Sequence, residues 1–236
     1  MNVVVAEADV DDPDDDVSWL RSLLERRRPK PGPVVGRWAL GIGDLVADHP
    51  ITPRILRGLT RKLNHFGGVA ISEESVEFDG DDVKWSDITE IRTRSLIEYL
   101  FTGGIDKQAD KLPLPWFPGR RLLINAISRA ALTLLLAAAK QELEGGALEI
   151  RIPAEVNHQG LLHTRELSPG MLAAVILADP AVRQCFEATA QAHGITICAA
   201  EDDVMEDADE RAEQIKSVLA RIQDKIDKLR PDSDGR

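Results

Sequence analysis

Two histidines that stand close together, His158 and His163, are the residues whose types could do chemistry, and Glu155 and Glu166 lie near them. Imidazoles and carboxylates in one segment can exchange protons or bind a metal ion. The metalloprotease pattern H-E-x-x-H needs its histidines four residues apart, so that both lie on one face of a helix. Here the spacing is five, and we expect residues 154–167 to form a loop. An enzyme that uses His158 or His163 is therefore one hypothesis.

Other reactive residue types lack the surroundings that their chemistry needs. A reactive thiol requires a positive, partly exposed setting, which we do not find around Cys185 or Cys198, and we expect both to be reduced. Ser168 stands outside a G-x-S-x-G motif and is expected to cap a helix. The acidic run 200–210 lacks the central glycine of a calcium loop. The sequence thus predicts no catalytic residue, no cofactor-binding residue and no metal ligand.

Charge is segregated along the chain, whose 236 residues carry a formal net charge of -11. Acidic runs at 11–16 and 201–210 enclose a more basic middle. The acidic excess argues against nucleic acid as the partner. The most apolar stretch, 122–139, is interrupted by polar residues, and no signal peptide is visible. We expect a cytoplasmic protein, with association to a membrane surface as an alternative.

The chain is expected to divide into three parts with an α+β fold. Residues 1–33 are expected to be a disordered acidic segment and linker with a short helix at 18–27, because an Asp-rich run buries too little apolar surface to offset its ordering entropy. Residues 34–200 are expected to form the globular domain. Residues 201–236 combine an acidic segment with a coiled-coil-like helix.

The globular domain is expected to hold a small antiparallel β-rich unit, a buried core helix and a βααβ segment. Asp79-Gly80 predicts a hairpin turn, because glycine accepts the positive φ of a tight turn. The helix at 120–144 is apolar over most of its circumference, which places it in the core. The strands of the β-rich unit are expected at 69–71, 76–78, 83–85 and 88–101. The βααβ segment is expected to have a strand at 148–152 that Pro153 ends, helices that begin at Ser168 and Asp179, the second of them stopping at Gly194, and a strand at 195–198.

The segment GVAISEESVEFDGDDVKWSDITEI has a recognisable order of strands and turns. A strand and a turn precede the V-x-F strand of Val76 and Phe78, and a second turn leads into W-S-D-I. The W-S-D-I residues are Trp85, Ser86, Asp87 and Ile88. Over residues 69–101 this order resembles bacterial pleckstrin-homology-like and GRAM-like domains. The resemblance implies a binding or scaffolding module. The chain departs from those domains, because the stretch before the core helix is too short for seven strands and a second α/β segment follows.

Basic residues in two places suggest a second hypothesis, which is binding to polyanions. The expected helix 52–66 has arginines opposite an apolar face, and lysine and arginine can neutralise the phosphates of lipids or nucleic acids. A charged stripe is equally the ordinary outer surface of an amphipathic helix. A peripheral anionic-membrane or nucleic-acid binder is therefore an alternative function. The residues that would carry it are Arg54, Arg57, Arg61, Lys62, Arg120 and Arg121.

Apolar residues between 208 and 230 recur at alternating spacings of four and three, which is a heptad seam. The seam covers about three heptads, the lower limit for a coiled coil. It predicts self-association or binding to a protein partner. Its main residues are Ile215, Leu219, Ile222, Ile226 and Leu229. Our first hypothesis is therefore a non-catalytic interaction or adaptor protein.

Overall fold

The computed structural model describes residues 13–49, 64, 67–99, 133, 150–160, 163–200, 217, 220 and 224. This part of the chain contains helices and two small four-stranded sheets. The expected α+β class is confirmed. The predicted helix 52–66, the predicted core helix 120–144 and the segment 201–236 lie outside the described residues, apart from single positions.

The first sheet is antiparallel throughout, in the order β1-β2-β3-β4. Its strands are β1 (Arg37–Gly41), β2 (Gly68–Ser72), β3 (Ser75–Phe78) and β4 (Asp81–Lys84). Asp79 and Gly80 join β3 to β4 with φ angles of 53° and 97°. Two consecutive positive φ angles are those of a type I′ turn, whose twist matches that of the strands. The predicted hairpin is confirmed, whereas β1 was not predicted.

The second sheet has the order β7-β6-β5-β8. Its strands are β5 (Ile88–Ser95), β6 (Arg151–Gln159), β7 (Thr164–Leu167) and β8 (Ile197–Ala199). β6 is antiparallel to β5 and β7, and β8 is parallel to β5. The predicted β-rich unit 69–101 is therefore divided between two sheets. The chain changes sheets at the 3-10 helix η3 (Trp85–Asp87).

Two expectations for residues 148–167 are wrong. Pro153, expected to end a strand, lies inside β6 opposite Thr93. The register shifts between Arg92 and Thr93, and such an irregularity accommodates a proline, which has no N–H to give to the ladder. Residues 154–167, expected to be a loop, instead supply most of the β6–β7 hairpin.

The helices, in chain order, begin mostly where local signals place them. They are α1 (Pro13–Arg26), α2 (Ile42–Asp48), α4 (Leu96–Tyr99), α6 (Met171–Ala178) and α7 (Pro180–Ala192). The Asp179 side chain caps α7 as predicted, and Gly194, with a φ of 73°, follows its end. Ser168 does not cap α6, because Gly170 occupies that position and the Ser168 hydroxyl donates to Glu166.

α1 begins at Pro13, five residues before the expected start at residue 18. Proline suits the first turn of a helix, since its missing N–H has no partner there. Residues 14–16, all aspartates, then lie in the first turn, where carboxylates interact favourably with the positive end of the helix dipole. This part of the acidic run is therefore helical, and Leu20 and Leu23 of the same helix are buried in the core.

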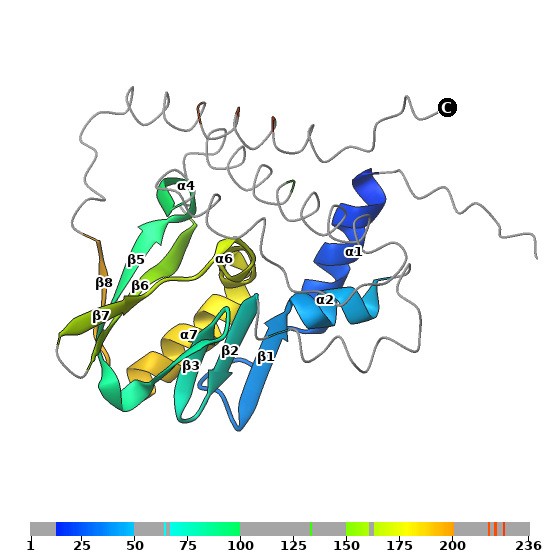
Figure 1. Ribbon diagram of the computed structural model, residues 1–236. Coiled ribbons are helices and arrows are strands. Elements are labelled where there is room, and N and C mark those ends of the chain that lie inside the picture. Colours follow the sequence, from blue (N-terminus) through cyan, green and yellow to red (C-terminus); the bar gives the residue numbers. More distant parts are fainter. Residues whose placement is uncertain are drawn as a thin grey trace, which may run out of the picture.

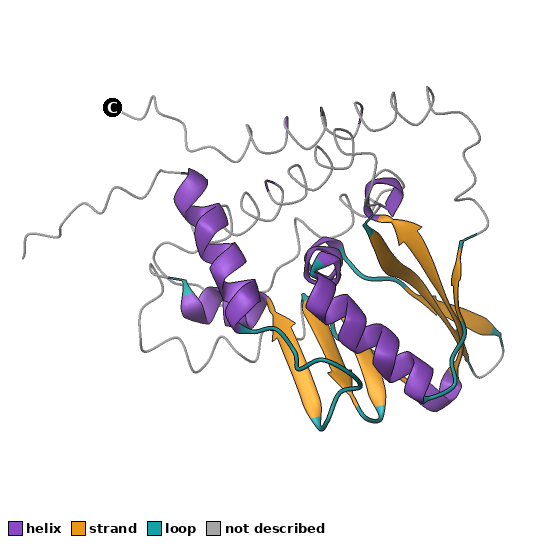
Figure 2. Ribbon diagram, turned by 180° about the vertical axis from the view of Figure 1, so that it is seen from behind, coloured by secondary structure: helices purple, strands orange, loops and turns teal. Residues whose placement is uncertain are grey.

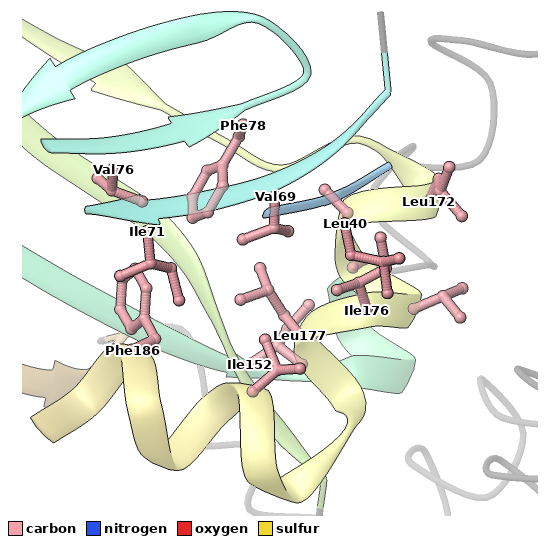
Figure 3. Packing of buried hydrophobic residues seen from close by; sticks show 14 of the residues in the cluster. Leu40, Val69, Ile71, Val76, Phe78, Ile152, Leu172, Ile176, Leu177 and Phe186 are labelled. Atoms are coloured by element: carbon pink, nitrogen blue, oxygen red, sulfur yellow. The ribbon is translucent and has the colours of Figure 1, made fainter. Parts of the chain in front are cut away.

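The core is centred on α6, which is apolar at every position and buried over residues 172–177. A helix that is apolar all round must be covered on all sides. α6 contacts β1 and β2 of the first sheet, β6 of the second sheet, and α7, and it lies with α7 between the two sheets (Figures 1 and 2). Figure 3 shows side chains from these elements meeting there, including Ile71, Ile152 and Phe186.

The helix pair α6–α7 connects β7 to β8 at opposite edges of the second sheet. β7 is parallel to β8, because β7 and β5 are both antiparallel to β6 and β8 is parallel to β5. The expected strand, two helices and strand are present. The first strand of this unit is β7, rather than the expected strand at 148–152.

Asp79 ties the β3–β4 turn to the start of α6. Its Oδ1 accepts a hydrogen bond from the Gly68 N–H at 2.9 Å, and its Oδ2 accepts one from the Gly170 N–H at 2.5 Å. The Tyr99 hydroxyl donates to the Pro169 carbonyl beside it, and burial raises the pKa of Tyr99. One carboxylate thus connects the first sheet to the central helix.

Replacing Asp79 should therefore lower the stability of the whole domain. We expect Asp79→Ala to reduce the free energy of unfolding by about 3 kcal/mol, because two bonds to a charged acceptor are lost. Asp79→Asn keeps one acceptor oxygen and tolerates the positive φ, so about half of that loss is expected. Urea denaturation measures both. Asp82→Ala, at an exposed position of the same hairpin, is the control, and an equal effect there would contradict the tie.

Candidate functional site

An open hollow of about 320 Å³ lies where β4 of the first sheet meets the β6–β7 hairpin of the second. We call it the β4 hollow. Its lining residues are Asp82, Val83, Lys84, Asp87, His158, Gln159, Gly160 and Arg165. Segments far apart in the sequence therefore build one concave surface, with β4 and η3 on one side and the hairpin on the other.

The wall formed by β4 has a polar face and a buried face. Val83 is buried, whereas Asp82 and Lys84 are exposed. Because side chains alternate along a strand, Asp82 and Lys84 share the face opposite to Val83. Two opposite charges, two residues apart, therefore lie along this wall.

The wall formed by the hairpin depends on a glycine. His158 and Arg165 are cross-strand partners in β6 and β7. A Cβ at Gly160 would lie 2.7 Å from the His163 carbonyl oxygen and 3.2 Å from the Arg165 side-chain carbons. Only a residue without a Cβ lets the arginine stem pack on the turn at this distance, which gives Gly160 a specific role in shaping the wall.

The hollow carries charges of both signs that are available to a ligand. Lys84, His158 and Arg165 make no side-chain hydrogen bond or ion pair with any other residue in the described part of the chain. Asp87 accepts a hydrogen bond from the Ser86 hydroxyl at 3.0 Å, and Asp82 lies on the opposite wall. The arrangement can bind a ligand that carries both an acidic and a basic group.

A second hollow of about 350 Å³ shares Lys84 with the β4 hollow. Its other lining residues are Glu73, Glu74, Trp85, Ser86 and His193. The Trp85 ring is buried, donates from Nε1 to the Ser72 carbonyl at 2.8 Å, and stacks on the His193 ring with centroids 5.6 Å apart. The tryptophan of the W-S-D-I motif is therefore a packing residue, and His193 covers its outer side.

The two predicted histidines do not share a site. His158 lies in β6 and lines the β4 hollow, whereas His163 is exposed at the hairpin connection and does not line it. Glu155 forms an ion pair with Arg94 at 2.7 Å, and Glu166 accepts the hydrogen bond of a serine. Of the four residues that drew attention in the sequence, only one therefore faces the hollow.

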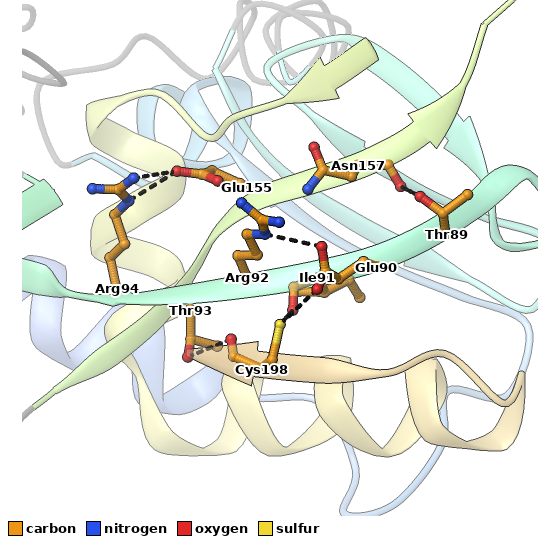
Figure 4. A network of polar contacts seen from close by, with 9 residues as sticks. All are labelled: Thr89, Glu90, Ile91, Arg92, Thr93, Arg94, Glu155, Asn157 and Cys198. Carbon is orange, nitrogen blue, oxygen red and sulfur yellow. Dashed lines mark hydrogen bonds and ion pairs between the residues drawn. The ribbon is translucent and has the colours of Figure 1, made fainter. Parts of the chain in front are cut away.

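A polar network crosses β5, β6 and β8 (Figure 4). Cys198 Sγ donates to Glu90 Oε1 at 2.9 Å, and Arg92 Nε donates to Glu90 Oε2 at 2.9 Å. These two bonds lower the pKa of Glu90, with that from Cys198 the larger cause. A carboxylate next to the sulfur repels a thiolate, so this setting does not activate Cys198 as a nucleophile.

Both cysteines are free, as expected. Cys185 is buried in α7, and burial raises the pKa of its thiol. No group of three or more His, Cys, Asp or Glu residues within the described ranges is arranged to hold a metal ion. No helix among those ranges is both long enough and apolar enough to cross a membrane.

The sequence reasoning missed four charged residues of the hollow: Asp82, Lys84 and Arg165 were not singled out, and Asp87 was noted only within the W-S-D-I motif. The alternation around Val83 could have indicated that Asp82 and Lys84 share an exposed face. The predicted binding residues lie outside the described residues. They are Arg54, Arg57, Arg61, Lys62, Arg120 and Arg121 for polyanions, and Ile215, Leu219, Ile222, Ile226 and Leu229 for association.

Comparison with known proteins leaves the assignment to the site itself. No protein-family model matches the chain, and no curated protein or solved structure does so either. The resemblance of residues 69–101 to pleckstrin-homology-like and GRAM-like domains therefore stays a prediction.

The network around Glu90 predicts a pH-dependent contribution to stability. Because the folded-state pKa of Glu90 is lowered, its contribution is present above the unfolded-state value of about 4.3 and is lost as the pH falls through the lower folded-state value. Glu90→Gln should therefore destabilise the protein at pH 7, and the difference from wild type should shrink below about pH 4. Denaturant unfolding over this pH range measures it.

Glu187→Gln on α7 is the matched control, because the Glu187 carboxylate has no hydrogen bond or ion pair within the described residues. We expect this variant to unfold like the wild type at every pH. A deficit of Glu90→Gln that stays constant from pH 7 to pH 3 would show that charge on Glu90 is not its cause.

Proposed function

We propose that the protein is a non-catalytic interaction protein of the adaptor type, and that the β4 hollow receives a polar segment of a protein partner. One observation carries the proposal: Lys84, His158 and Arg165 surround an open hollow without a side-chain partner in the described chain. Charged groups at an exposed surface select a partner by complementarity more than they bind it tightly.

The mixture of charges favours a polypeptide over a phosphate polymer. Asp82 and Asp87 line the same hollow as Lys84 and Arg165. Closely spaced phosphates would meet these carboxylates and be repelled, and the net charge of -11 adds to that repulsion at long range. A peptide can place a side chain of each sign where it is attracted.

The second contact of the proposed adaptor is the heptad helix at 208–230. Ser217, Ala220 and Asp224 are helical and exposed, and none of them belongs to the seam. Exposed positions beside an apolar seam are what a helix needs to pair through that seam alone. The partner of this helix is a second copy of the chain or another protein.

Charge placed in the seam should break an assembly that depends on it. We expect Leu219→Asp and Ile226→Asp each to reduce the solution mass of the full chain to that of a monomer, because a carboxylate cannot be buried in an apolar interface without a partner. Multi-angle light scattering measures the mass. Ser217→Asp, at an exposed position of the same helix, should leave it unchanged. A wild-type monomer would exclude self-association and leave only a different protein as partner.

A photoreactive amino acid in the β4 hollow tests whether a partner occupies it. Placed at Gln159, which lines the hollow, it should form a covalent adduct with another protein in cells. The same group at Gln184, an exposed glutamine on α7, should not. The adduct should be lost in Lys84→Glu if the hollow recognises charge. Equal adducts at both positions, or an adduct unaffected by Lys84→Glu, would count against this site.

A further inference from the structure

β4 is an edge strand, and the geometry of its hairpin fixes which backbone groups it leaves free. After a two-residue turn, the flanking residues form a hydrogen-bonded pair, and hydrogen-bonded and non-hydrogen-bonded pairs then alternate. The flanking residues are Phe78 and Asp81. The Trp85 N–H donates to the Glu74 carbonyl at 3.0 Å, four pairs further along, which is where the alternation requires a bond.

The alternation turns the N–H and C=O groups of Asp82 and Lys84 away from β3, toward the free edge of the sheet. Both residues also line the β4 hollow. Within the described residues no strand pairs with β4 on this side. An unpaired edge of this kind is a template for another extended segment.

We propose that β4 accepts an extended segment of the partner polypeptide as an added antiparallel strand. The segment carries an acidic side chain opposite Lys84 and a basic side chain opposite Asp82. Opposite charges directly across two strands stabilise their pairing. Arg165 lies across the hollow as a further cation, and Asp87 as a further anion. This inference rests on the proposed function, for which it names the binding mode.

The size of the hollow favours a single strand over a second folded copy of the chain. Its volume of about 320 Å³ lies at the small end of the range for binding pockets. The β6–β7 turn, with Gln159 and Gly160, forms the far wall. A single extended segment fits beside β4 within that wall, whereas another copy would have to bring the rest of its sheet.

The probe is the peptide acetyl-Thr-Glu-Val-Lys-Thr-amide, titrated into the full-length protein. An antiparallel strand in this register places its glutamate opposite Lys84 and its lysine opposite Asp82. Amide hydrogen exchange followed by NMR should slow at Asp82 and Lys84 when the peptide binds. The amides of Asp81 and Val83 already bond to β3, so their exchange should not change.

Charge variants test the register. Lys84→Glu should weaken binding about tenfold, because an attraction across the strands becomes a repulsion. A peptide with lysine in place of its glutamate should recover the affinity on that variant. Lys30→Glu, at an exposed lysine outside the hollow, should bind the original peptide as the wild type does.

The backbone bonds have their own control, a peptide methylated on the amide nitrogens of its glutamate and lysine. This peptide keeps the charges and should lose binding. Equal binding of the methylated peptide, or unchanged exchange at Asp82 and Lys84 with the original peptide at millimolar concentration, would overturn strand addition. Dimerisation that depends on Lys84, without peptide binding, would overturn it in favour of a second copy. An adduct at Gln159 in either case would leave the adaptor function intact.

Discussion

Burial of α6 is the constraint on which the rest of this structure depends. The sequence of the helix has no polar face, and residues 172–177 are all buried. Each fully buried leucine or isoleucine contributes roughly 1.5–3 kcal/mol, but only if every side of the helix is covered. One small sheet can cover only one side. The first sheet, the second sheet and α7 together provide the cover, and the chain therefore has to change sheets at η3.

Local signals in the sequence were sufficient for the turns and caps. Asp79-Gly80 predicts a hairpin because few residues adopt two positive φ angles, and Asp179 predicts a helix start because its carboxylate satisfies free N–H groups. Pro153 misled for the same reason that these succeeded. Proline usually ends a strand, but a shift in register at Arg92 and Thr93 admits it. That shift belongs to a strand about sixty residues away, so no local pattern could indicate it.

The candidate site is less predictable than the fold, because it is made of residues that only the sheets bring together. His158 attracted notice through its residue type alone. Arg165 fell in an expected loop, and Lys84 looked like an ordinary exposed residue of a hairpin. What makes them a site is that the β6–β7 hairpin comes beside the edge of β4, and this follows from the position of both sheets around α6. The sequence contains the charges, and burial of an uncharged helix decides where they meet.

The edges of the two sheets show how exposed strands can be kept apart and yet remain selective. β8, at one edge of the second sheet, has only three residues, which limits the backbone that it offers. β4 is nearly as short but alternates Asp82 and Lys84 along its exposed face. An edge of one sign would repel or attract broadly, whereas alternating signs are satisfied only by a strand with the reverse pattern. Salt screens exposed charges beyond about 8 Å, so these side chains set the register at close range, and backbone hydrogen bonds supply the attraction that holds an added strand.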